Sequence, residues 1–129
     1  MTLTTIVLLV LLFYVAQIFL QETSRYGFNL RQIMGNRDVR PEPSVIADRL
    51  DRAKNNMLEA LPLFLGLAML SLVKGAAASE ATNGAFIFLV ARVLYVPIYA
   101  AGTPVLRSLV WLTGVAGLLM MALSLFAGS

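Results

Sequence analysis

The sequence predicts an all-α integral membrane protein, in which four transmembrane helices form a left-handed bundle. Hydrophobic residues make up 59% of the 129 residues and charged residues only 13%. Soluble domains average about 45–50% apolar and about 25% charged residues. The mean hydropathy is +0.81, and the charged residues gather in one stretch that leaves four long apolar segments. At this length we expect a single domain over residues 1–129.

A helix needs about 20 residues to cross a bilayer; the first and last segments reach this length outright, and the two between them do so if Glu59 and Arg92 are tolerated inside. Residues 2–21 and 108–129 carry no charge, residues 81–101 are interrupted only by Arg92, and residues 60–73 are uncharged after Glu59. We therefore predict helices near 3–21, 46–73, 82–100 and 104–126. A signal peptide is the alternative for the first segment. The lack of a basic start and of a small-residue cleavage site favours a retained helix.

The loop between the first two helices predicts the orientation. Residues 22–45 are polar and rich in arginine, and such loops stay in the cytoplasm. Both termini are then outside, and in a bacterium the protein would lie in the inner membrane. Ser44 offers a cap to the second helix. The run Gly102-Thr103-Pro104 is typical of a helix stop, an N-cap and a proline at the first helical position.

Several chemistries are excluded by composition. The chain has no cysteine and no histidine, so we expect no metal site, no thiol nucleophile and no histidine base. Its net charge is +3 with a pI near 9.7. In a membrane protein this excess of Lys and Arg reflects the orientation of the helices across the bilayer, so we expect no nucleic-acid partner.

Two of the predicted helices carry polar residues on one face. The spacings of 3 and 4 place each set together: Arg49, Arg52, Asn56 and Glu59 in the second helix, and Arg92, Tyr95 and Tyr99 in the third. An ionisable residue at the centre of a membrane helix costs about 2.5–3.5 kcal/mol. We therefore expect Glu59 and Arg92 to pair, or to line a polar pocket open to the cytoplasm. A purely structural ion pair and ordinary packing of the tyrosines are the alternatives.

Other residues have expected positions as well. Trp111 is expected in the aromatic belt at the membrane boundary. Gly66, Gly114 and Gly117 are expected where helices touch. Arg107 falls in the first turn of the last helix, where unpaired backbone N–H groups favour an anion. It either stabilises such an anion or anchors the helix to lipid headgroups.

Two segments resemble the signatures of a known family. They are R-A-K-N-N-M-L-E-A-L-P-L-F (52–64) and A-R-V-L-Y-V-P-I-Y (91–99), and they resemble motifs of the MAPEG family, the membrane-associated proteins in eicosanoid and glutathione metabolism. The resemblance covers the whole chain and is greatest to the short bacterial members. It implies a homotrimer of four-helix subunits that binds glutathione near the cytoplasmic side, between neighbouring subunits.

The resemblance also implies roles for single residues. The family's glutathione-binding positions are matched by Arg52, Asn56, Glu59, Arg92, Tyr95 and Tyr99, to which Arg49 is added because it shares their helix face. Arg107, followed by Ser108, resembles the arginine that activates the thiol and is the candidate catalytic residue. Trp111 stands where some members carry a tyrosine near the thiol.

Three functions are compatible with these features of the sequence. The first is a glutathione-dependent transferase or peroxidase acting on lipophilic electrophiles, with glutathione as cosubstrate. The second is a non-catalytic, accessory subunit of a larger membrane complex. The third is a small multidrug-type exporter, although such exporters depend on a carboxylate in the first helix, and residues 3–21 contain none.

Overall fold

The computed structural model describes residues 1–25, 44–74 and 79–127. They form four helices, α1 (Leu3–Arg25), α3 (Val45–Val73), α4 (Ser79–Ala101) and α5 (Pro104–Ala127). All four are long and apolar enough to cross a membrane, as the sequence predicts. Each helix matches its predicted segment, with some ends unchanged and others extended by one to four residues. Of the predicted polar loop, residues 26–43 lie outside the described residues.

Two of the predicted helix boundaries are confirmed. The Ser44 hydroxyl accepts a hydrogen bond from the Ala47 backbone N–H at 3.1 Å, which caps α3. Gly102 has φ +75°, a conformation that favours glycine, and it ends α4 two residues before Pro104 opens α5. Thr103 acts differently from the prediction, because its hydroxyl donates backwards to the Ile98 carbonyl at 3.2 Å.

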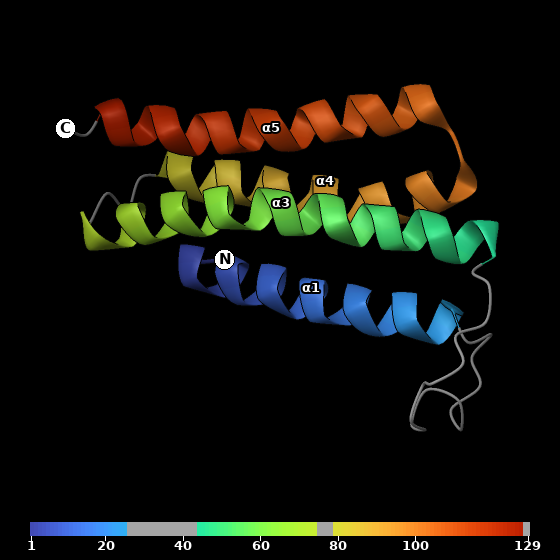
Figure 1. Cartoon of the computed structure of the whole chain (residues 1–129). Helices are drawn as coiled ribbons and strands as arrows, with labels where there is room; N and C mark the ends of the chain where they lie inside the picture. Colours follow the sequence, from blue (N-terminus) through green and yellow to red (C-terminus); the bar gives the residue numbers. More distant parts are fainter. Residues whose placement is uncertain (26–43, 75–78, 128–129) are drawn as a thin grey trace.

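The helices run alternately up and down, so the N-terminus and the end of α5 lie at the same end of the bundle (Figure 1). α4 and α5 form the most extensive helix pair, and α1 packs on α3 and α4. At the centre, the Phe64 and Phe88 rings stack with centroids 4.7 Å apart. The buried side chains around them include Ile6, Val10, Met57 and Met121.

Glycines allow α4 and α5 to approach closely. A Cβ at Gly117 would lie 2.5 Å from the Gly84 carbonyl oxygen, and a Cβ at Gly84 would lie 2.6 Å from the Gly117 oxygen. Gly114 is also buried at this contact, and a Cβ there would lie 3.6 Å from the Ala91 methyl group. The predicted contact roles of Gly114 and Gly117 are therefore confirmed. A Cβ at Gly66 would meet no side chain or neighbouring helix within 4 Å among the described residues, so its predicted contact role is not found in the described part of the chain.

We expect Gly117→Ala to destabilise the fold, because its methyl group would press against backbone atoms that cannot rotate away. Overpacking of this kind typically costs about 1–3 kcal/mol. Thermal unfolding in detergent, followed by circular dichroism, should show a lower Tm. Gly66→Ala is the matched control and should not lower the Tm, because its methyl group meets open space and Ala is the better helix former. Equal Tm values for the two variants would contradict the close packing of α4 on α5.

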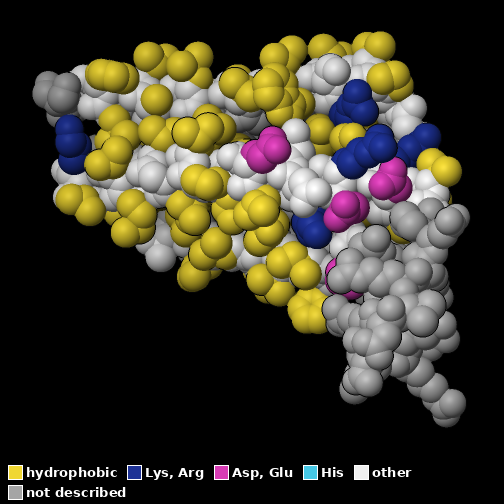
Figure 2. Space-filling view, viewed as in Figure 1, with side chains coloured by type: hydrophobic (Ala, Val, Ile, Leu, Met, Phe, Trp, Pro, Cys, Tyr) yellow, Lys and Arg dark blue, Asp and Glu magenta, His cyan; other side chains and the backbone are white. Residues whose placement is uncertain are grey.

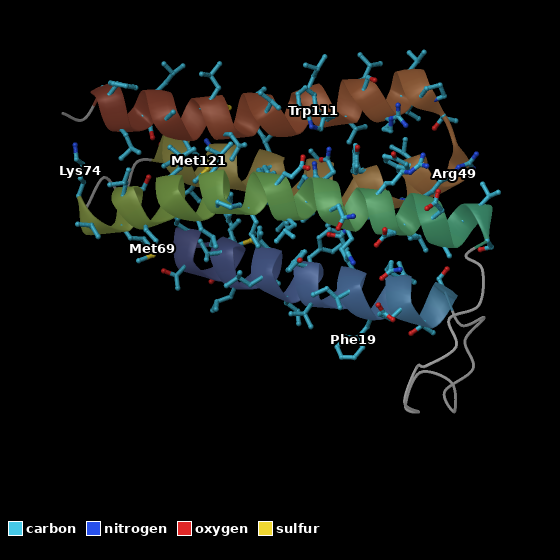
Figure 3. The ribbon with its side chains drawn as sticks, viewed as in Figure 1. Phe19, Arg49, Met69, Lys74, Trp111 and Met121 are labelled. Atoms are coloured by element: carbon cyan, nitrogen blue, oxygen red, sulfur yellow. The ribbon has the colours of Figure 1, made fainter. Side chains whose placement is uncertain are left out.

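Charge is distributed unevenly along the bundle. Lys, Arg, Asp and Glu side chains gather at the end where α3 begins, whereas hydrophobic side chains cover much of the remaining face (Figure 2). Lys74 lies at the opposite end, where α3 stops (Figure 3). A charged end joined to an apolar body is the surface that a bilayer-spanning bundle requires.

Candidate functional site

A pocket of about 290 Å³ opens among α3, α4 and α5 in the cation-bearing half of the bundle. Five of the eight residues singled out from the sequence line it: Arg52, Asn56, Tyr95, Tyr99 and Arg107. Ser108 and Trp111 complete the lining. Trp111 lies partway along α5 and is 43% exposed (Figure 3). The residues brought together thus come from three helices and from positions up to 59 apart in the sequence.

Arg92 lies next to the lining residues and is buried, with 3% of its surface exposed. Its Nη1 donates to Asn56 Oδ1 at 2.8 Å, and its guanidinium carbon lies 4.5 Å from the centroid of the Tyr95 ring. Among the described residues, its Nε and Nη2 have no hydrogen-bond partner. Arg92 therefore holds two pocket residues in place from the protein interior.

Glu59 neither pairs with Arg92 nor lines the pocket, so the expected Glu59–Arg92 pair is not formed within the described chain. The reason is the orientation of α3. Each residue of a helix turns by about 100°, so Glu59, two residues from both Met57 and Leu61, points away from them. Those two are buried, and Glu59 is consequently exposed on the opposite side of α3.

Aromatic rings form the α4 side of the pocket. The Tyr95 and Tyr99 rings meet edge to face, with centroids 5.5 Å apart. The Arg107 guanidinium carbon lies 4.8 Å from the centroid of the Tyr99 ring. This cation–π contact joins the first turn of α5 to the last turn of α4 and keeps the Arg107 charge at the pocket.

The remaining arginines of α3 differ in their surroundings. Arg52 lines the pocket and forms an ion pair with Asp48 at 3.0 Å, but its side chain is 64% exposed, so the pair adds little stability. It remains free to turn towards a ligand. Arg49 does not line the pocket, and instead its Nη1 donates to the Ala100 carbonyl at 3.0 Å.

The pocket chemistry suits an anion. Two guanidinium groups, an amide and two phenols offer directed N–H and O–H donors, and guanidinium binds carboxylates in a bidentate manner. Among the described residues, no group of three or more Asp or Glu side chains is placed to hold a metal ion. The lining contains no carboxylate. A ligand with carboxylate groups therefore fits this pocket.

The model of the MAPEG family matches residues 1–127 of the 129-residue chain. No curated protein and no solved structure matches it. The match spans all four helices and every residue of the pocket.

Proposed function

The chain belongs to the MAPEG family and is a multi-pass membrane protein, and we propose that it is a glutathione-dependent transferase or peroxidase acting on lipophilic electrophiles. The observation that carries the proposal is the pocket lined by Arg52 and Arg107 among long apolar helices. Two guanidinium groups converge on this pocket, and a third, that of Arg92, is buried beside it at a desolvation cost, which favours a binding role over a purely structural one.

Glutathione matches the donors of this pocket. It carries two carboxylates, an ammonium group and a thiol. Arg52 and Asn56 on α3 would bind a carboxylate by charge-assisted hydrogen bonds, and the hydroxyls of Tyr95 and Tyr99 would donate further ones. The volume of about 290 Å³ is at the lower limit of ligand pockets, about 300–1,000 Å³. A neighbouring subunit would enlarge it.

Arg107 is the proposed catalytic residue. Its charge lies in the first turn of α5, where the unpaired backbone N–H groups add further positive potential. A glutathione thiol placed there would lose its proton more easily, and the thiolate is the reacting form. Its sulfur would attack an electrophilic carbon, forming a C–S bond while the leaving group departs with the bonding electrons. Exposed apolar residues around the bundle would deliver lipophilic substrates from the membrane.

Glu59 supports the assembly as a homotrimer. It is exposed on a membrane-spanning segment of α3, where contact with lipid would be costly. A neighbouring subunit would cover it, and Glu59 could then reach the ammonium group of glutathione held between two subunits. The arginine-rich end would face the cytoplasm, with both termini outside, in the inner membrane if the protein is bacterial.

We expect native mass spectrometry from detergent to show an assembly of three 14.0 kDa chains. Glu59→Leu should weaken that assembly if the carboxylate is bound at the subunit contact, whereas Glu80→Gln, on an exposed residue at the start of α4, should leave it intact. A stable monomer or an antiparallel dimer for the wild type would contradict the trimer.

Activity is tested with purified protein, glutathione and an aryl chloride whose conjugation changes its absorbance. The proposal predicts turnover above the uncatalysed rate and saturation with glutathione. Binding without turnover of aryl chlorides or lipid hydroperoxides would favour the accessory-subunit function. Proton-coupled drug uptake by vesicles that contain the protein would favour an exporter instead.

A further inference from the structure

Arg49 lies at the beginning of α3, beside the turn that joins α4 to α5 (Figure 3). Its Nη1 donates to the Ala100 carbonyl at 3.0 Å. A Cβ at Gly102 would lie 2.7 Å from the same Nη1, so the guanidinium packs directly on the glycine. We define this contact between Arg49, Ala100 and Gly102 as the corner contact.

The corner contact adds to the hydrogen bonding of the α4 C-terminus. The Tyr99 carbonyl accepts from the Gly102 N–H at 3.0 Å, the Ile98 carbonyl accepts from the Thr103 hydroxyl at 3.2 Å, and the Ala100 carbonyl accepts from Arg49. The end of a helix carries partial negative charge that a cation stabilises. α4 has no basic residue in its last turn. Arg49 of α3 therefore supplies the missing cation from another helix.

The same corner holds one wall of the pocket. Tyr99 lies in the last turn of α4, and Arg107 lies in the first turn of α5, where its N–H donates to the Thr103 carbonyl at 3.0 Å. The opposite wall consists of Arg52 and Asn56 on α3, the helix that also carries Arg49. The corner contact thus joins the two walls directly.

We propose that Arg49 is a positioning residue, which sets the distance between the α3 wall and the α4–α5 wall and thereby places Arg107. Gly102 is required beside it, because a side chain there would displace the guanidinium and would strain a residue at φ +75°. The catalytic consequence of this proposal depends on the proposed glutathione function. The structural consequence, the position of the α4–α5 wall relative to α3, does not depend on that function.

The structural part is tested without any ligand. Trp111 is the chain's only tryptophan and lines the pocket from α5, so its fluorescence reports the position of that wall. Arg49→Met should shift its emission to the red and raise quenching by acrylamide, and Arg49→Lys should have a smaller effect. Lys54→Met is the matched control, because Lys54 contacts Asp51 and Gln21 away from the corner. Fluorescence unchanged in Arg49→Met would overturn the proposal.

The catalytic part is tested by kinetics in two backgrounds. A misplacement of about 1 Å can cost about 100-fold in rate, so Arg49→Met should lower kcat by at least about tenfold. In an Arg107→Met background, Arg49→Met should lower kcat no further, because Arg49 affects the reaction only by positioning Arg107. An equal loss of glutathione affinity in both backgrounds would make Arg49 a ligand-binding residue and overturn the proposal. A lower Tm with unchanged kcat and fluorescence would overturn it as well.

The two proposals can fail separately. If the wild type neither binds nor turns over glutathione, the proposed function fails, and the fluorescence of Trp111 still decides whether Arg49 sets the position of the α5 wall.

Discussion

Arg107→Leu should leave glutathione bound but remove most of its reactivity. The other donors of the pocket, Arg52 and Asn56, remain in place, so we expect the affinity to change by no more than a few-fold, whereas conjugation at neutral pH falls by at least about tenfold. The physical reason is the loss of the cation that would stabilise the thiolate. Thiolate absorbance in the ultraviolet, measured at saturating glutathione, should fall in parallel with kcat.

Arg52→Leu is the comparison for Arg107→Leu. Arg52 lines the same pocket from α3, so its loss should raise KM for glutathione more than it lowers kcat. If Arg107 only anchors α5 to lipid headgroups, its variant would keep both the thiolate signal and the rate, and the catalytic role would be disproved.

Arg92→Met should raise the stability of the protein. The guanidinium is buried, no carboxylate is within ion-pair distance among the described residues, and two of its nitrogens lack partners. Replacing a buried charge that has no counter-ion by an apolar side chain of similar length removes its desolvation cost, so the free energy of unfolding should increase. Asn56 can bond water at the pocket after the change. Differential scanning fluorimetry in detergent should show a higher Tm.

The same variant should bind glutathione more weakly, because Asn56 and Tyr95 lose the group that holds them. Arg92→Lys is the control and should not raise the Tm, since it retains a buried charge. Adding Glu59→Gln should change the Tm additively, because the two side chains do not interact. A fall in Tm for Arg92→Met that Glu59→Gln partly reverses would show that the two residues are paired after all.

The four helices could be predicted because their length and apolar composition are properties of single segments. The ends of the helices depend on residues outside the apolar pattern. α1 continues past residue 21 to Arg25 because the polar residues that follow, including Thr23 and Ser24, do not interrupt a helix. α4 starts at Ser79 rather than 82, with Glu80 in its first turn, where an acidic residue is favourable.

The polar face of α3 shows what spacing alone leaves open. Asn56 and Glu59 are nearly one helical turn apart, so the sequence pattern allows either residue to contact Arg92. The choice depends on which side of α3 is buried, and that is set by the packing of Met57 and Leu61 against the other helices. Arg92 consequently contacts Asn56.

Trp111 was expected at the membrane boundary, and its place in the pocket was missed. An aromatic residue in an apolar helix has the same local pattern in both places. Its direction is fixed by the rotation of α5, which the close contact of Gly84 with Gly117 determines. The family resemblance, which places Trp111 near the position of a tyrosine beside the thiol, was the one signal that pointed towards the pocket.

The measurement that tests the account most directly is a calorimetric titration of glutathione into the purified protein in detergent. The account predicts saturable binding by the wild type, at least about tenfold weaker binding by Arg52→Leu because a charge-assisted hydrogen bond is lost, and unchanged binding by Lys54→Met. An absence of saturable binding by the wild type, or equal affinity in Arg52→Leu, would contradict the assignment of the pocket to glutathione.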